Sequence, residues 1–137
     1  MKKGFTLVEL VIVIVIVGIL SIVAVPIYRG YTRKAMGTEA KSLLGSIQTA
    51  QKVYYAEHST FKTVSSVTDF DEELDVDARS NKYFTGFTVT VNNSGTDDLN
   101  FVAMTSGKTD GAASGISMTL TAYKSGSPEW NDVGLNS

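Results

Sequence analysis

The first part of the chain is almost wholly apolar, and the pattern changes twice further along. No charged side chain occurs from Leu10 to Tyr28, and about 20 apolar residues are what a helix needs to cross a bilayer. Six apolar residues then recur at spacings of four and three, which is one face of a helix: Met36, Ala40, Leu43, Ile47, Ala50 and Tyr54. The pattern predicts one long helix, apolar to about residue 28 and amphipathic to about residue 57.

The second half of the chain alternates between apolar and polar residues, as half-buried strands do. Residues 58–81 lack a regular apolar pattern, so we expect a loop there. Strands are expected at 82–91, 100–106 and 116–123, and their short connections favour an antiparallel meander. The tail from Ser125 to Ser137, with Trp130, is expected to cap the sheet irregularly. The predicted fold class is α+β, with the long helix packed on a three- to four-stranded antiparallel sheet.

Two residues interrupt the apolar half of the predicted helix. Gly18 lowers helix propensity, and Pro26 lacks a backbone donor and would clash with the carbonyl of Ile22. A kink or local melting is therefore expected near Pro26. The alternative is a simple bend that directs the helix toward its globular domain, and the two interpretations are compatible.

Composition and charge exclude several classes of function. The chain has 137 residues, a net charge of −2 and no cysteine, so disulfides and cysteine-ligated metals are excluded. Its balance of charge is not that of a nucleic-acid-binding protein, and Arg29, Arg33 and Lys34 are better explained by a membrane interface or by neighbouring subunits. His58, the single histidine, is expected to be a solvated loop residue. No catalytic set and no cofactor is expected.

An acidic segment from Asp69 to Asp77 raises the question of calcium. The positions that an EF-hand loop reserves for Gly and Glu hold Leu74 and Ser80, so we expect no metal site. Phe70, Leu74 and Val76 are expected to anchor this segment on the core. The sequence Asn92-Asn93-Ser94 matches a glycosylation sequon only weakly, because three-residue matches are common.

The residue hardest to explain is Glu9, a carboxylate at the start of an apolar span. Acidic residues within such spans are costly and indicate function. A secretory signal peptide would fit Lys2 and Lys3, but the apolar run exceeds the usual 7–15 residues. A plain membrane anchor would explain the length of the run and leave Glu9 without a purpose.

The residues Gly4-Phe5-Thr6-Leu7-Val8-Glu9-Leu10, with their short basic leader, resemble the class III signal of type IV pilins and the related pseudopilins. The resemblance implies that a prepilin peptidase cuts between Gly4 and Phe5 and that Phe5 becomes N-methylated. It also implies that Glu9 pairs with the amine of a neighbouring subunit during assembly. In this family, glycine and proline at the spacings of Gly18 and Pro26 lie in or beside a stretch that can unwind inside the filament.

The resemblance divides the chain into a leader (1–4), a transmembrane or filament-core helix (5–28), the amphipathic half of that helix (29–57), a variable αβ-loop (58–81), and a sheet with a C-terminal loop (82–137). It implies a homo-oligomeric pilus serving adhesion, twitching motility or DNA uptake. The precursor would sit in the inner membrane with its C-terminal domain outside the cytoplasm, and the filament would be extracellular. A major pseudopilin of type II secretion, in a periplasmic pseudopilus, is one alternative. A monomeric membrane-anchored binding module is another.

Overall fold

The computed structural model describes residues 4–79, 81–92 and 99–135. The basic leader residues Lys2 and Lys3 and most of the possible sequon lie outside the described residues. The chain forms two compact units, residues 1–32 and residues 33–137. Helix α1 (Leu7–His58) contributes to both units.

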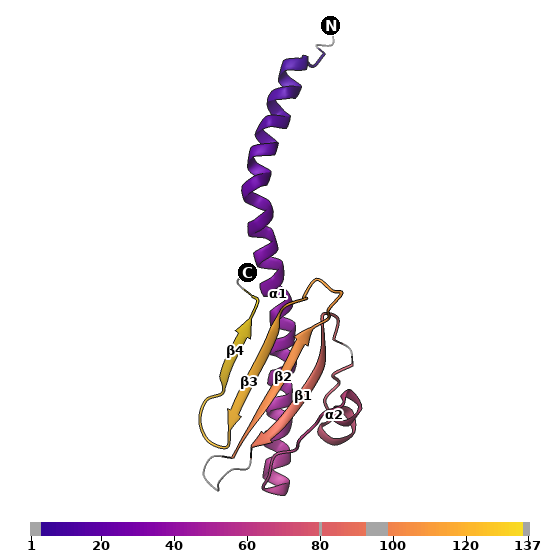
Figure 1. Ribbon diagram of the computed structural model, residues 1–137, viewed down its shortest axis with the longest axis vertical. Coiled ribbons are helices and arrows are strands. Elements are labelled where there is room, and N and C mark those ends of the chain that lie inside the picture. The colour runs from indigo at the N-terminus through magenta and orange to yellow at the C-terminus, as the bar shows by residue number, and fades with distance from the viewer. Residues whose placement is uncertain (1–3, 80, 93–98, 136–137) are drawn as a thin grey trace. The chain divides into compact units, whose positions relative to one another are not determined.

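The first unit consists of the apolar part of α1. The helix begins at Leu7 and stays helical through Gly18 and Pro26 (Figure 1). An apolar run of this kind has the length and hydropathy of a membrane span, with a mean hydropathy of 3.3 over its most apolar window and none of that window buried. The resemblance to a membrane span rests on length and composition alone. A signal sequence near the N-terminus has the same length and apolar composition.

The second unit contains a four-stranded antiparallel sheet in the order β1-β2-β3-β4 (Figure 1). Its strands are β1 (Phe84–Asn92), β2 (Asn100–Gly107), β3 (Ser117–Tyr123) and β4 (Glu129–Val133). The α+β class and the meander are confirmed. The prediction for the tail is wrong in part, because Leu120 pairs with Trp130 and residues 129–133 form the fourth strand. All five residues of β4 are exposed, so the strand has no alternating pattern to detect.

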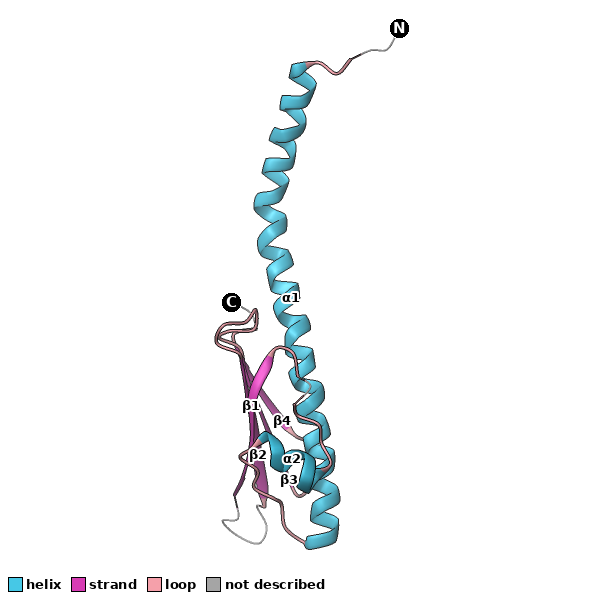
Figure 2. Cartoon of the chain, turned by 90° about the vertical axis from the view of Figure 1, so that its right-hand side faces the viewer, coloured by secondary structure: helices cyan, strands magenta, loops and turns pink. Residues whose placement is uncertain are grey.

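The core of this unit lies between the sheet and the part of α1 after Thr32, which run side by side in Figure 2. The predicted helix face is nearly correct, since Ala40 and Ile47 are fully buried and the other four members are partly buried against the core. The buried stripe is nevertheless shifted by one residue at three of its positions. Gly37, Leu44 and Gln51 are buried, whereas the prediction named Met36, Leu43 and Ala50. The members of the stripe are Gly37, Ala40, Leu44, Ile47 and Gln51.

The segment predicted as a loop contains a short helix, α2 (Val67–Leu74). Ser66 caps it by accepting hydrogen bonds from the backbone N–H groups of Thr68 and Asp69, and Asp75 ends it with a left-handed φ of 51°. The prediction of a loop is wrong for these eight residues. So short a helix shows no clear apolar period in the sequence, and only its cap and its one buried face identify it. The anchoring prediction is confirmed, because Phe70, Leu74 and Val76 are buried.

The C-terminal segment is held to α1 without a disulfide. The Arg33 guanidinium donates from Nε to the carbonyl oxygen of Gly134 at 3.0 Å, and Lys41 forms an ion pair with Asp132 at 3.6 Å. Leu135 is 8% exposed and packs on Gly37, where an added Cβ would lie 2.7 Å from its Cδ2 atom. The glycine is therefore needed for space, so that the end of the chain can lie close to the helix.

Candidate functional site

The first turn of α1 is closed by a reciprocal set of hydrogen bonds between Thr6 and Glu9. The backbone N–H of Thr6 donates to Glu9 Oε2 at 2.9 Å, and the Thr6 hydroxyl donates to the same oxygen at 2.7 Å. The backbone N–H of Glu9 in turn donates to Thr6 Oγ1 at 3.3 Å. This is a capping box, in which a threonine before the helix and a glutamate three residues later satisfy each other's backbone.

The capping box explains how a carboxylate can be held at the start of an apolar helix. Negative charge is favoured at a helix N-terminus, where the free N–H groups carry the positive end of the macrodipole. Both bonds from Thr6 end on Oε2, whereas a carboxylate has about four acceptor positions. Glu9 can therefore keep its local bonds and still accept a cationic donor from outside the chain.

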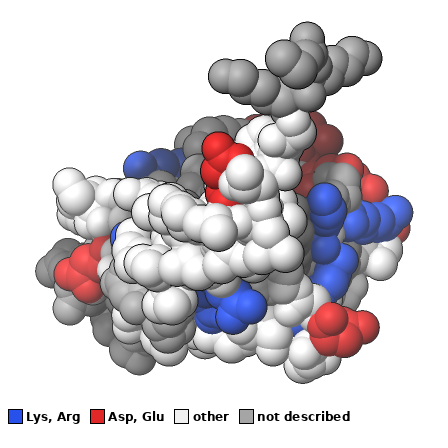
Figure 3. Space-filling view, turned by 90° about the horizontal axis from the view of Figure 1, so that it is seen from above, with Lys and Arg blue, Asp and Glu red and all other residues white. Residues whose placement is uncertain are grey.

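Beyond the first turn, the apolar unit presents its side chains outward on every side. Leu7 is 78% exposed, Ile22 is 76% exposed, and none of the large apolar side chains between them is buried. Seen from above in Figure 3, the N-terminal end of α1 is mostly white. A helix that is apolar all round needs lipid or other helices as its surroundings.

The other residues predicted from the signal motif are spread along this unit and do not converge on one point. Gly4 and Phe5 precede the helix, and both are exposed, Phe5 by 83%. Gly18 and Pro26 lie within the helix, and a Cβ at Gly18 would meet nothing within 4 Å. The structure therefore leaves the backbone at Gly4 accessible and places no neighbour against Gly18.

The remaining candidates from the sequence have structural explanations. Arg33 holds the C-terminal segment, as described above, and is not a free basic residue. His58 is the last residue of α1, not a loop residue, and its ring stacks on Tyr54 with the centroids 4.1 Å apart. Among the described residues, no group of three or more His, Cys, Asp or Glu side chains is arranged to hold a metal ion.

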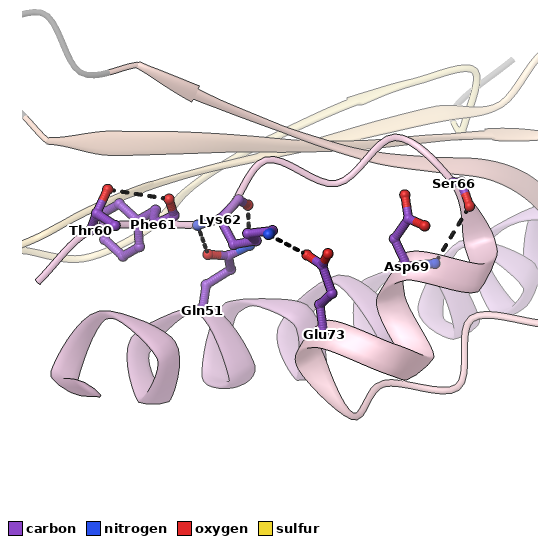
Figure 4. A network of polar contacts seen from close by, with 7 residues as sticks. All are labelled: Gln51, Thr60, Phe61, Lys62, Ser66, Asp69 and Glu73. Carbon is purple, nitrogen blue, oxygen red and sulfur yellow. Dashed lines mark hydrogen bonds and ion pairs between the residues drawn. The ribbon is translucent and has the colours of Figure 1, made fainter. Parts of the chain in front are cut away.

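Two structural roles were not predicted from the sequence, the capping of α1 by Thr6 and the burial of Gln51. Thr6 and Glu9 have the Thr-x-x-Glu spacing that marks a capping box before an apolar run, so that signal was readable. Gln51 was not identifiable, because a polar residue beside the predicted stripe is ordinarily solvated. Its fully buried side chain donates to the carbonyl oxygen of Lys62 at 2.6 Å and accepts from the Lys62 N–H at 2.9 Å (Figure 4).

Comparison with known proteins supports the family resemblance seen in the N-terminal motif. A family profile described as the prokaryotic N-terminal methylation motif matches residues 1–25. A "Fimbrial protein" of Pseudomonas aeruginosa is 35% identical over 136 residues, covering 95% of this chain and 84% of its own length. A "Type IV major pilin protein PilE1" of Neisseria gonorrhoeae is 50% identical over 58 residues, which is 42% of this chain and 35% of that protein. No solved structure matches.

The N-terminal motif, the long helix on a four-stranded sheet and these relatives together place the protein: the chain belongs to the type IV pilin family. Members of this family are structural subunits and not enzymes. The family resemblance recognised in the N-terminal motif is thereby confirmed.

Proposed function

We propose that the chain is a structural subunit of a type IV pilus, in which the N-terminal helices of many copies pack together. The observation that carries this proposal is the apolar surface of α1, which none of the described residues covers and which holds a single carboxylate near its tip. In the precursor this surface would lie in the membrane, and after assembly it would lie against other helices. The names of the relatives, a fimbrial protein and a major pilin, support the filament.

Processing of the precursor would take place at the accessible residues before the helix. A prepilin peptidase would cut between Gly4 and Phe5, and the new amine of Phe5 would be methylated. The leader would then comprise residues 1–4, followed by the filament-core helix (5–28), its amphipathic continuation (29–57), the αβ-loop (58–81) and the sheet with its C-terminal loop (82–137). The match of the methylation profile to residues 1–25 supports the leader and the start of the core helix in this division.

Assembly would use the charge pair between Glu9 and the Phe5 amine of a neighbouring copy. Two opposite charges attract strongly in a low-dielectric bundle, but both must first lose their hydration. The pair would therefore fix the register of subunits more than it would stabilise the filament. The hydrogen bonds from Thr6 would keep the carboxylate partly satisfied until its partner arrives.

Gly18 and Pro26 would be the places where α1 can lose helical structure inside the filament. Pro26 provides no backbone donor, and Gly18 has weak helix propensity. Both residues are helical in the single chain. Any unwinding would therefore be a response to the packing of neighbouring copies.

The first prediction concerns Glu9. Replacing it with alanine (Glu9→Ala) should abolish filaments, because the amine of the next subunit loses its partner, while the protein remains in the inner membrane through its apolar helix. Electron microscopy of cell surfaces and immunoblots of membrane fractions measure the two effects. Val8→Ala, which shortens a neighbouring apolar side chain, should leave filaments unchanged. Normal numbers of filaments in Glu9→Ala would show that Glu9 has no role in assembly.

Mass spectrometry of isolated filaments tests the class of machine and the processing together. Long extracellular fibres with subunits that begin at N-methylated Phe5 are expected for a pilus. Fibres restricted to the periplasm would indicate a type II secretion pseudopilus, and an unassembled membrane protein would indicate an anchored binding module. Adhesion, twitching motility and DNA uptake are then compared between cells with and without these fibres.

A further inference from the structure

One face of the sheet in the second unit is not covered by the described helices. In β1, β2 and β3, buried core residues alternate with residues that face the other way. α1 lies on the core side of the sheet in Figure 2, and the strands run in front of it in Figure 1. We call the side away from α1 the outer face. Its side chains lie outside the core, so their chemistry is not set by packing against α1.

Two successive rows of the outer face repeat one arrangement. In each row, a threonine of β1 and a threonine of β3 flank an apolar side chain of β2. The rows are Thr90-Val102-Thr121 and Thr88-Met104-Thr119. Because neighbouring strands lie about 4.8 Å apart, the two threonines of a row are about 10 Å apart. Within the part of the chain that the structure describes, their four hydroxyl groups take part in no hydrogen bond, so they are available to a ligand.

The outer face also carries almost no charge. β1, β2 and β3 contain no Asp, Glu, Lys or Arg, although about a quarter of the residues in a typical soluble domain are charged. β4 has two acidic residues, of which Asp132 faces α1 and pairs with Lys41. The other, Glu129, is opposite Thr121 at the edge of the outer face. The high β-propensity of threonine explains its presence in strands, but not the missing charges.

The neutrality of the outer face decides which partners fit it. Nucleic acids and anionic membranes are bound through lysine and arginine, which the four strands lack. The residues that contribute most to protein interfaces are Trp, Tyr and Arg, and rarely Ser or Thr. A neutral polysaccharide has hydroxyl groups, C–H surface and no charge. Its hydroxyls can exchange hydrogen bonds with the threonines, which are both donors and acceptors, and its C–H surface can lie on Val102 and Met104.

From this complementarity we propose that the outer face binds an extended, neutral, β-linked polysaccharide such as cellulose. β-linked glucose chains are straight and ribbon-like, which suits a broad sheet face. The inference rests on the proposed function, because α1 lies toward the axis of the proposed filament and the outer face then points outward. Each copy binds weakly, since its hydrogen bonds replace bonds to water. Many copies along one fibre add their contacts, so the affinity belongs to the filament.

Binding of isolated filaments to microcrystalline cellulose tests the outer face. Thr88→Glu with Thr119→Glu places two carboxylates beside Met104, and each has to lose its hydration on binding. The filament concentration that half-saturates the cellulose should rise about tenfold, a factor equivalent to about 1.4 kcal/mol. Thr88→Ser with Thr119→Ser keeps both hydroxyls and should bind as the wild type does. Thr109→Glu with Ser125→Glu adds the same charge in exposed loops and should also leave binding unchanged.

Oxidative footprinting of wild-type filaments measures the contact without any variant. Met104 is 48% exposed at the centre of the outer face, and exposed methionine is readily oxidised to its sulfoxide. Cellulose should protect Met104 in bound filaments, as measured by mass spectrometry after exposure to hydroxyl radicals. Trp130, which is opposite Leu120 on the α1 side of the sheet, should be oxidised equally in bound and free filaments.

Salt distinguishes a neutral ligand from an ionic one, because screening weakens only the binding of charges. Binding to cellulose should be equal at low and high salt. Wild-type filaments that do not bind cellulose, or bind it without protection of Met104, would overturn the inference and leave the proposed function intact. Protection of Met104 in bundled filaments without cellulose would show that a second copy occupies the face. Absence of filaments from the wild type would instead contradict the proposed function.

Discussion

At the scale of single residues, the capping box changes how Glu9 is understood. A carboxylate in an apolar segment is costly when it is unsatisfied, but Thr6 supplies two donors to it and receives one bond in return. The residue that was remarkable for its charge is thus also part of the ordinary chemistry of a helix start. Local capping and pairing with a neighbour are compatible because they use different acceptor positions of the same carboxylate.

The second prediction follows from this geometry. Thr6→Val removes the hydroxyl and with it two of the three bonds, and loss of a capping side chain destabilises a helix start by about 1 kcal/mol. The amides of the first turn of α1 should therefore exchange their hydrogens faster, as measured by NMR of the full chain in detergent micelles. Thr6→Ser keeps the hydroxyl and should retain slow exchange. Equal exchange rates in Thr6→Val and the wild type would show that the capping box does not stabilise the helix start.

At the scale of elements, two glycines of α1 differ in a way that the sequence does not reveal. A Cβ at Gly37 would lie 2.7 Å from Leu135 Cδ2, whereas a Cβ at Gly45 would meet nothing within 4 Å. Both residues lie inside the helix, where glycine is less favourable than alanine. Only Gly37 has a packing reason to be glycine, because it makes room for the C-terminal segment.

The third prediction compares these two positions. Gly45→Ala should raise the free energy of unfolding of the second unit by about 0.8–1 kcal/mol, the difference in helix propensity. Gly37→Ala should gain less or lose stability, because Leu135 has to move. Denaturation of the full chain in detergent by urea, followed by the fluorescence of Trp130, measures both variants. A larger gain at Gly37 than at Gly45 would contradict the tight packing of Leu135.

A single residue of the αβ-loop, Lys62, attaches the loop to both α1 and α2. Gln51 binds the backbone of Lys62, and the Lys62 ammonium reaches Glu73 of α2 at 2.7 Å (Figure 4). The hydrogen bond to the Glu73 carboxylate raises the pKa of Lys62 above its ordinary 10.5, against the opposing effect of burial. The charged form of Lys62 is therefore favoured in the folded chain.

The fourth prediction is the pH dependence of this attachment. Because the folded pKa is the higher one, the stabilisation is complete below pH 10.5 and is lost as the pH rises through the folded value. The wild type should unfold at a higher temperature than Glu73→Gln at pH 8, and the difference should close in strongly alkaline solution. Thermal unfolding monitored by circular dichroism at several pH values measures it. A difference that persists unchanged at high pH would show that the ion pair is not its cause.

At the scale of the whole molecule, the two units differ in the exposure of their apolar side chains. Every buried apolar side chain that the structure describes lies between Ala40 and Leu135, within the second unit. The described part of the first unit exposes its large apolar side chains and buries none of them. The second unit therefore contains the interactions needed to fold, while the first depends on lipid or on other copies.

The fifth prediction follows from this division. A fragment of residues 33–137 should fold as a soluble monomer at micromolar concentration, because it keeps the core and loses the apolar helix. Gel filtration and circular dichroism measure its size and structure. An aggregated or unfolded fragment would show that the apolar half of α1 is required for the fold.

Much of the architecture could be predicted because it depends on local patterns. The apolar run, the helix face around Ala40 and Ile47, and the alternation in β1, β2 and β3 each have a period that the sequence displays. β4 and α2 could not be predicted with equal success. β4 is exposed on all its residues and is a strand only because β3 offers it an edge, and α2 is too short for a period to show.

The sequence by itself indicated the family, because the N-terminal methylation motif occupies a few adjacent positions. The capping box between Thr6 and Glu9 lies within the same positions but was recognised only in the structure. The sequence also determined the long helix and the class of the fold. Only the tertiary structure decided that Gln51 is buried on the backbone of Lys62 and that Leu135 lies on Gly37. These features join residues far apart in the chain, and their positions are fixed by packing and not by any local period.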